Sequence, residues 1–208
     1  MEEEMAKRRR DGQWERVVYT RYADDMVILV DGYPQWQPHV GMIQERLSQE
    51  LKKVEIEINE EKTRVVDLGQ GGSFGFLGFD IRAVRNRFGK RFVLRTPMRK
   101  KQSELIRRVR MILKYSRHRQ LKEVLEKIRP VIVGWVNYFR VGNACRAFDW
   151  IRFEIMRKIR RFAMKQKGRR GCGWKRWSNQ AIYTEWGLVN NYIVQYFYRS
   201  TVKVSPVR

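Results

Sequence analysis

The sequence predicts a mixed α+β chain, with β-hairpins and a packed helix in residues 1–97 and a helical, strongly basic domain in residues 98–208. Two observations favour this division. Apolar residues alternate in the first part, as in strands, and recur after Pro97 with the helical period of 3.6. Charge changes at the same point, because residues 98–208 hold 28 of the 45 Lys and Arg residues but only 6 of the 22 Asp and Glu residues.

The first part is expected to contain one helix among strands and turns. Its highly charged residues 1–13 are expected to form a helix or a frayed end. Residues 15–30 are predicted to form a β-hairpin whose tip is Ala23-Asp24-Asp25, and apolar residues at helical spacing predict a helix over residues 40–51. Residues 85–90 are expected to form a turn. Further strands are expected at residues 56–58, 64–68, 74–81 and 91–94.

The second part is expected to be a set of amphipathic helices. Their apolar stripes lie at residues 105–113, 121–128, 131–139 and 148–162. The second of these helices is expected to stop near Pro130, since proline breaks a helix interior. Residues 165–175 are predicted to be a basic, glycine-rich loop, and the aromatic tail at residues 177–197 to be weakly helical.

The net charge of +23 points to a polyanionic partner. Nucleic acid fits better than an anionic membrane surface, because the cations run through several elements and not one surface helix. No apolar run approaches the roughly 18 residues of a membrane span. The two cysteines, Cys145 and Cys172, lie far apart without metal-ligand spacing, so we expect reduced thiols and a cytoplasmic protein.

The adjacent carboxylates Asp24 and Asp25 carry the most chemical information in the first part. They lie between two apolar, β-branched runs, and adjacent carboxylates repel each other unless a cation neutralises them. Two hard oxygen ligands suit Mg²⁺, which completes its shell with water and phosphate oxygens. Asp-Asp pairs are also common in plain turns, so the residues alone leave both interpretations open.

Five sequence blocks, in order, resemble those of group II intron reverse transcriptases. Tyr22-Ala23-Asp24-Asp25 is similar to the catalytic motif of that family. Residues 57–63 and 76–79 look like the next two blocks, and Gly134-Trp135-Val136-Asn137-Tyr138-Phe139 resembles the signature of the maturase domain, also called the thumb or X domain. Residues 173–177 and 188–192 together form the fifth block, which is similar to the usual end of the bacterial members. The resemblance covers nearly the whole chain from about residue 15.

The resemblance implies the remainder of a polymerase palm in residues 1–97 and a thumb, or maturase (X), domain in residues 98–208. It makes Asp24 the principal Mg²⁺ ligand of this segment and Asp25 the supporting one, with Mn²⁺ as a possible substitute. Tyr22 would then pack near the nascent base pair, and Ala23 would keep the turn small where the primer end approaches.

Two further sites follow from the resemblance alone. Lys62 resembles the lysine proposed to donate a proton to the leaving pyrophosphate, and the alternative interpretation is a solvent-facing lysine in a charged turn. Phe76, Leu77 and Gly78 look like part of the hairpin that grips the primer strand, where glycine permits close backbone approach.

Three basic clusters in the second part are expected to bind RNA phosphates. Any one of them could be only a solvated helix face, but all three in so basic a half favour phosphate binding. Structured RNA is recognised largely through its shape and backbone, which suits many arginines. The clusters consist of Arg107, Arg108, Arg110, Arg157, Lys158, Arg160, Arg161, Arg169 and Arg170.

The resemblance therefore implies an RNA-directed DNA polymerase whose Mg²⁺-dependent chemistry is coupled to intron RNA binding, splicing and retrohoming. Its partners would be intron RNA, a DNA primer or target, and dNTPs. Family members carry fingers and a third metal-binding aspartate upstream, and no segment here supplies them. We therefore expect that the chain alone does not polymerise and that a separate or missing N-terminal polypeptide completes it. We also expect no zinc-type endonuclease domain of the kind found in some members, because the two cysteines and two histidines do not form its pattern.

Two other functions stay open. One is a non-enzymatic maturase, in which the basic half binds intron RNA and the aspartates are relics. The other is a reverse transcriptase adapted to another task, such as phage defence.

Overall fold

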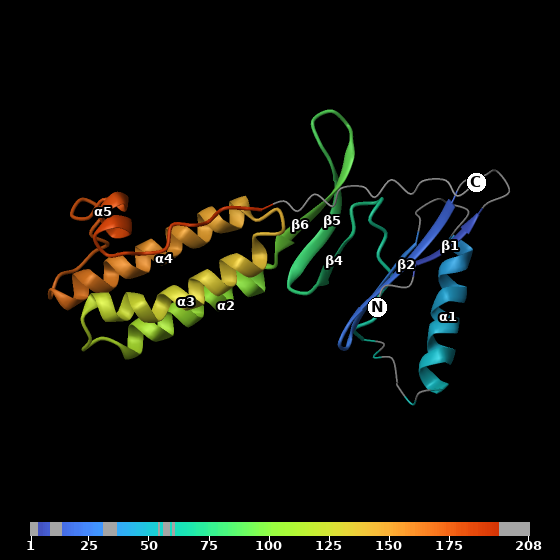
Figure 1. The fold of residues 1–208 in the computed structure, drawn as a ribbon, viewed down its shortest axis with the longest axis horizontal. Coiled ribbons are helices and arrows are strands. Elements are labelled where there is room, and N and C mark those ends of the chain that lie inside the picture. The colour runs from blue at the N-terminus through green and yellow to red at the C-terminus, as the bar shows by residue number, and fades with distance from the viewer. Residues whose placement is uncertain are drawn as a thin grey trace, which may run out of the picture. The chain divides into compact units, whose positions relative to one another are not determined.

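The structure is a computed structural model, which confirms a mixed α+β chain. Its described part contains two three-stranded sheets and five helices (Figure 1). Two compact units are formed, residues 1–77 with 81–93 and residues 78–80 with 94–208. The assignment of palm and thumb stays a prediction. The described residues are 4–8, 14–30, 37–53, 55, 59 and 61–195.

The first sheet contains the predicted hairpin and one unexpected strand. Strands β1 (Glu4–Arg8), β2 (Trp14–Tyr22) and β3 (Asp25–Val30) pair antiparallel in the order β1-β2-β3. The expectation of a helix or frayed end is wrong for residues 4–8, because this charged segment gains its hydrogen bonds from the edge of β2. In the β2–β3 pair Tyr22 lies opposite Asp25, which leaves Ala23 and Asp24 as a two-residue turn.

The predicted helix after this sheet is confirmed as α1 (Gln37–Lys53). Leu51 is buried, and Lys52 and Lys53 in the last turn complement the helix dipole. The strand expected over residues 56–58 lies outside the described residues. Residues 64–68, by contrast, form no strand. The Asp67 carboxylate accepts hydrogen bonds from the amides of Gly69 (2.7 Å) and Gln70 (3.3 Å), and this local turn replaces strand pairing.

The second sheet has the order β4-β5-β6, formed by β4 (Ser73–Phe76), β5 (Phe79–Arg85) and β6 (Arg91–Pro97). The single strand expected over residues 74–81 is therefore two strands. They are separated by Leu77 and Gly78, whose φ angles of 48° and 78° reverse the chain tightly. The predicted turn between β5 and β6 is confirmed, with the Asn86 side chain accepting from the amides of Phe88 and Lys90.

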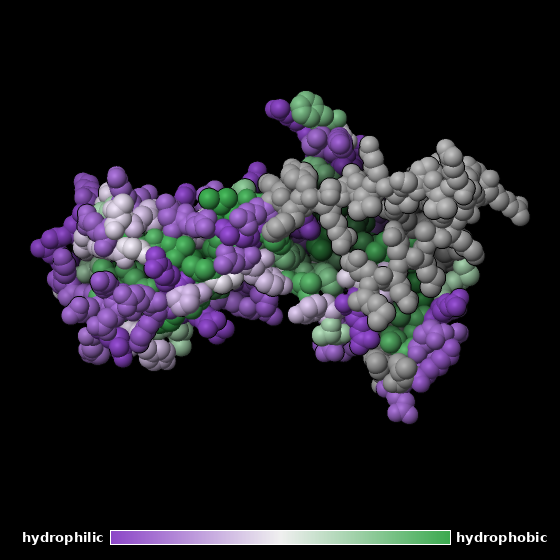
Figure 2. Space-filling model, in the orientation of Figure 1, coloured by the Kyte–Doolittle hydropathy of each residue, from purple (hydrophilic) through white to green (hydrophobic). Residues whose placement is uncertain are grey.

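Three long helices form the core of the second unit, and α2 (Arg99–Tyr115), α3 (Leu121–Phe139) and α4 (Cys145–Gln166) lie side by side (Figure 1). The predicted apolar stripes are the buried ones, with the most enclosed side chains on α3 and α4. In Figure 2 hydrophilic residues cover most of the visible face of this unit, and hydrophobic residues show mainly between the helices. Fully buried aliphatic side chains include Val109, Val124, Ile128, Ile132, Ile151, Ile155 and Ile159.

Helix α3 continues through Pro130, so the expected break there is wrong. Proline removes one backbone hydrogen bond, that to the carbonyl of Glu126 four residues earlier. Pro130 and Glu126 are both exposed, so water can satisfy this carbonyl. Burial of Ile128 and Ile132 on either side of the proline keeps both halves in one helix.

The segment between α3 and α4 is joined closely to the end of β6. The Asn143 amide donates to the Arg95 carbonyl (2.6 Å), and the Asn143 side chain accepts from the Arg95 amide (3.0 Å). Gly142, the residue before Asn143, packs against Arg95 and Phe79 at this junction. A Cβ atom there would lie 2.7 Å from both the Arg95 carbonyl oxygen and the Phe79 ring, so only glycine fits without a shift.

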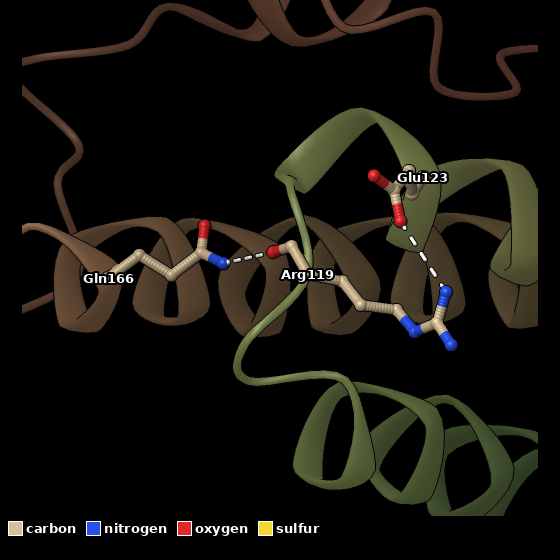
Figure 3. Close-up of polar contacts among 3 residues, drawn as sticks. All are labelled: Arg119, Glu123 and Gln166. Atoms are coloured by element: carbon tan, nitrogen blue, oxygen red, sulfur yellow. Dashed lines mark hydrogen bonds and ion pairs between the residues drawn. The ribbon is translucent and has the colours of Figure 1, made fainter.

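The other end of the helical bundle is joined by Gln166 at the end of α4. Its side-chain amide donates to the backbone carbonyl of Arg119 (2.7 Å), in the turn between α2 and α3 (Figure 3). The Arg119 guanidinium in turn pairs with Glu123 in the first turn of α3 at 3.5 Å. These contacts hold a basic turn against α4.

The expected weakly helical tail is only a short helix, α5 (Asn179–Thr184), followed by extended chain. This chain returns along the bundle (Figure 1) to Arg140, whose carbonyl accepts from the Gln195 amide (2.8 Å). The Arg140 guanidinium donates to the Ile193 carbonyl and the Asn191 side chain. Within the described residues, no helix is both long and apolar enough to cross a membrane.

Two glycine substitutions should have opposite effects on stability. We expect Gly142→Ala to lower the free energy of unfolding by about 1–3 kcal/mol, because the new methyl group overlaps rigid backbone. Gly134→Ala, within α3 and with open space around its Cβ position, should raise it by up to about 1 kcal/mol. Urea unfolding followed by circular dichroism measures both, and a Gly142→Ala variant as stable as the parent would contradict this packing.

Candidate nucleic-acid interface

The adjacent acids lie at the tip of the β2–β3 hairpin. Asp24 is in the turn, Asp25 is the first residue of β3, and both are exposed. Ala23 has a φ of 50°, a left-handed conformation that costs a non-glycine residue roughly 1–2 kcal/mol. The Arg21 guanidinium donates to the Ala23 carbonyl at 2.9 Å and so supports this strained turn. Tyr22, beside the turn, is 64% exposed.

Asp24 and Asp25 fit part of a Mg²⁺ coordination shell. Both offer hard carboxylate oxygens, and Mg²⁺ commonly uses one or two protein carboxylates together with water and substrate phosphates. Among the residues that the structure describes, no group of three or more His, Cys, Asp and Glu side chains is arranged to hold a metal ion.

The other predicted residues of the first part lie in two different turns. Lys62 is exposed, and its amide donates to the Asn59 side chain (3.1 Å), in a turn that Asn59 organises. Phe76, Leu77 and Gly78 lie at the β4–β5 turn, where all three are half-buried. The Gly78 carbonyl accepts from the Met98 amide at 2.9 Å, which fixes this turn to the start of α2. Their roles as proton donor and primer grip stay predictions.

The structure brings together two of the three basic clusters. Helices α2 and α4 pack directly on each other, and the charge of Arg110 on α2 acts on Lys158 of α4. Burial lowers the pKa of Lys158, and the positive charges of Arg157, Arg110 and Arg161 lower it further, against the opposing effect of Glu154. The cations are thus close enough to repel one another. We call Arg107, Arg110, Arg157, Lys158 and Arg161 the basic face.

Members of the basic face differ in their local partners. Arg107 and Arg110, three residues apart, are exposed neighbours on α2. Arg157 pairs with Glu154 at 2.7 Å and is the most enclosed of the four arginines. Arg108 is exposed on α2, and Arg169 and Arg170 are exposed in the loop after α4.

The structure corrects the expectation that Arg160 binds RNA phosphates. Arg160 is buried (1% exposed) and is not available at the surface. Its guanidinium donates to the Trp177 carbonyl (3.2 and 3.1 Å) and to the Asn179 side chain (2.6 Å), and lies 4.1 Å from the ring centre of Trp174. Burial lowers its pKa. Arg160 therefore joins α4 to the loop and helix that come after it.

Sequence reasoning missed two exposed aromatic residues near these cations, Phe153 on α4 and Trp174 in the following loop. The sequence did contain a signal for the exposure of Phe153. Phe153 falls outside the apolar stripe that runs through Phe148, Ile151 and Ile155, so helical periodicity places it away from the core. For Trp174 no periodic signal exists.

Two arginines assigned the same role by sequence should behave differently. Arg160→Ala should lower the free energy of unfolding by about 2–4 kcal/mol, because the Trp177 carbonyl and Asn179 lose a buried, charged donor. Arg107→Ala, at an exposed position on α2, should change it by less than about 0.5 kcal/mol. Equal stability of the two variants in urea unfolding would show that Arg160 does not support the fold.

Comparison with protein families identifies this region. A family model described as the group II intron maturase-specific domain matches residues 102–186, which include most of α2, all of α3, α4 and α5, the basic face and Arg160. The hairpin with Asp24 and Asp25 lies outside the match. No curated protein matches the chain. Residues 102–186 are therefore similar to the group II intron maturase-specific domain, and this similarity indicates a maturase-related function for the region.

Proposed function

We propose that the chain binds group II intron RNA through the basic face and so promotes folding and splicing of the intron. The observation that carries this proposal is the direct packing of α2 on α4 within the matched region, because these two helices carry all the cations of the basic face. A double-stranded or folded RNA presents closely spaced phosphates. Cations on two packed helices can contact several of them at once without bending either helix.

Charge balance supports the same conclusion. Residues 98–208 hold 28 Lys and Arg residues against 6 Asp and Glu residues, so the acids of this half can neutralise only a minority of its cations. Phosphate binding would release counterions from the RNA and relieve repulsion among the cations. Recognition through shape and backbone needs no single base-reading side chain.

A finer proposal concerns the β2–β3 hairpin. We infer that Asp24 and Asp25 hold Mg²⁺, or Mn²⁺ in its place, for RNA-directed DNA synthesis in which a DNA primer is extended with dNTPs. The bound ion would neutralise phosphate charge in nucleotidyl transfer. The exposed carboxylates and the strained Ala23 support this, because strain in tight turns is concentrated at functional sites. Lys62 as proton donor and the β4–β5 turn as primer grip belong to the same proposal.

In this proposal, polymerase activity also needs fingers and a third metal ligand. Among the described residues, no group of three or more His, Cys, Asp and Glu side chains is arranged to hold a metal ion. We propose that additional polypeptide supplies the fingers and the third metal ligand, in a cytoplasmic ribonucleoprotein that splices the intron and returns it to DNA. The alternative is a maturase without polymerase activity, which binds the same RNA but needs neither aspartate.

Removing charge from the basic face should weaken RNA binding and its salt dependence. For Arg107→Ala/Arg110→Ala/Lys158→Ala, we expect the affinity for intron RNA to fall at least about tenfold. The slope of log K against log salt should decrease by about 2–3, at somewhat less than one per lost phosphate contact. Filter binding at several salt concentrations measures both.

A matched variant keeps this test specific. Lys122→Ala/Lys127→Ala/Arg129→Ala removes the same charge from exposed positions on α3. It should lower the slope by less than one. Equal effects of the two triple variants would show that binding follows total charge and not the basic face.

The substitution Asp24→Ala should separate the two functions. In the ribonucleoprotein that contains the remainder of the polymerase, primer extension on an RNA template should fall at least about 10³-fold, while intron splicing stays within twofold of the parent. Glu45→Ala, an exposed acid on α1, should change neither. Undiminished DNA synthesis by Asp24→Ala would exclude the metal-binding proposal, and a parent complex that splices but never extends a primer would favour the non-enzymatic maturase.

A further inference from the structure

Two aromatic side chains of the maturase domain form an exposed, stacked pair. Phe153 on α4 and Trp174 in the α4–α5 loop (residues 167–178) have ring centres 5.6 Å apart and an interplanar angle of 20°. They remain 52% and 44% exposed, respectively. We call this pair the aromatic shelf. Single exposed aromatics are ordinary, but a contiguous aromatic surface on a highly charged domain commonly marks a binding site.

The aromatic shelf is held in place by buried and close-packed groups. Arg160 lies over the Trp174 ring at 4.1 Å, and its guanidinium is itself bound to Trp177 and Asn179. Gly173, next to Trp174, has a φ of 65°, and a Cβ there would lie 2.8 Å from the Trp177 ring. The loop is thus set before any ligand arrives, which reduces the entropy lost on binding.

Positive charge surrounds the aromatic shelf. Arg157 lies one helical turn from Phe153, and Arg161 donates to the Cys172 sulfur (3.1 Å) in the loop that carries Trp174. The two acids within one helical turn of Phe153 are already paired, Glu154 with Arg157 and Asp149 with Arg152. Further exposed cations of the same loop are Arg169, Arg170, Lys175 and Arg176. A ligand with a flat, apolar face and flanking negative charge matches this arrangement.

A nucleotide whose base is unpaired has these properties. Bases inside an RNA helix have both faces covered by their neighbours, so only a bulged, looped or terminal base offers a free face to an aromatic side chain. Stacking on an aromatic side chain contributes about 1–3 kcal/mol per base. The basic face, by contrast, offers cations for phosphates, and this binding does not distinguish paired from unpaired nucleotides.

We propose that the aromatic shelf stacks one unpaired base of the bound RNA, while cations of the α4–α5 loop contact the flanking phosphates. This inference rests on the proposed RNA binding and adds to it a preference for RNA with a free base. A protein partner could also cover the aromatic shelf, but the density of arginines around it favours a polyanion.

The experiment compares three short RNA helices with the full chain. One is a perfect duplex, the second has a single bulged adenosine, and the third has an abasic nucleotide at the bulge. We expect the parent to bind the bulged RNA about tenfold more tightly than either of the others, by fluorescence anisotropy at constant salt. The abasic RNA removes the contribution of bulge flexibility.

Leucine variants identify the side chain responsible. Phe153→Leu should abolish the preference for the bulged adenosine and leave the salt dependence unchanged, since no charge is removed. Trp174→Leu should do the same, with folding checked by circular dichroism. Phe88→Leu is the matched control, because Phe88 is 77% exposed and lies beside Arg87 at 4.7 Å in the β5–β6 turn. Phe88→Leu should keep the full preference.

Failure of the aromatic shelf and failure of RNA binding are distinguishable. Equal affinity of the parent for all three RNAs, or a preference that survives Phe153→Leu, would overturn the stacking proposal and favour a protein as the occupant. Loss of the preference in Phe88→Leu as well would overturn it too. If the parent binds none of the RNAs, the proposed RNA-binding function itself is wrong.

Discussion

Excess positive charge is the constraint on which the rest of the maturase region depends. In residues 98–208, one-to-one pairing would leave 22 of the 28 cations without an acidic partner in that half. Four of the six acids, Glu104, Glu123, Asp149 and Glu154, pair with a cation three or four residues away. The three exposed pairs among these, those of Glu104, Glu123 and Asp149, contribute little stability. The buried stripes of α2, α3 and α4 must therefore offset the repulsion, and a bound polyanion would stabilise the same fold by reducing it.

Arg160 shows how a cation in such a domain can serve the fold. Its neighbours Lys158 and Arg161 belong to the basic face, and the sequence of this stretch does not separate the three. Burial of Arg160 depends on residues 174–179, which fold back over α4 and supply a carbonyl, an amide oxygen and an indole ring. Periodicity along one helix predicts which face meets the neighbouring helices. It does not predict which cation a distant loop will cover.

The same distinction explains how much could be predicted from the sequence. The β2–β3 hairpin, α1 and the stripes of α2 and α4 were predictable, because each follows from a local period in apolar residues.

The errors in the predicted elements have different physical origins. β1 depends on a pairing partner that a charged segment does not reveal, and residues 64–68 lose strand structure to the Asp67 side chain. Pro130 leaves α3 intact because packing on both sides exceeds the cost of one solvent-exposed carbonyl. For the candidate site, residue chemistry predicted the basic clusters, but their convergence on α2 and α4 required the fold.

Backbone strain adds an argument about the hairpins that periodicity could not provide. Within the described residues, Ala23, Glu55 and Leu77 are the non-glycine residues with positive φ. Two of them, Ala23 and Leu77, lie at the tips of the hairpins for which we propose metal binding and primer contact. Glycine would adopt either conformation without steric cost, so a turn selected only for stability would favour it. A side chain at these tips restricts the turn and thereby positions the next residues of the chain. These are Asp24 and Asp25 in one hairpin and Gly78, whose carbonyl is bound to Met98, in the other. Such positioning is useful where a reacting group must meet a primer end, and it has little purpose in a turn that only reverses the chain.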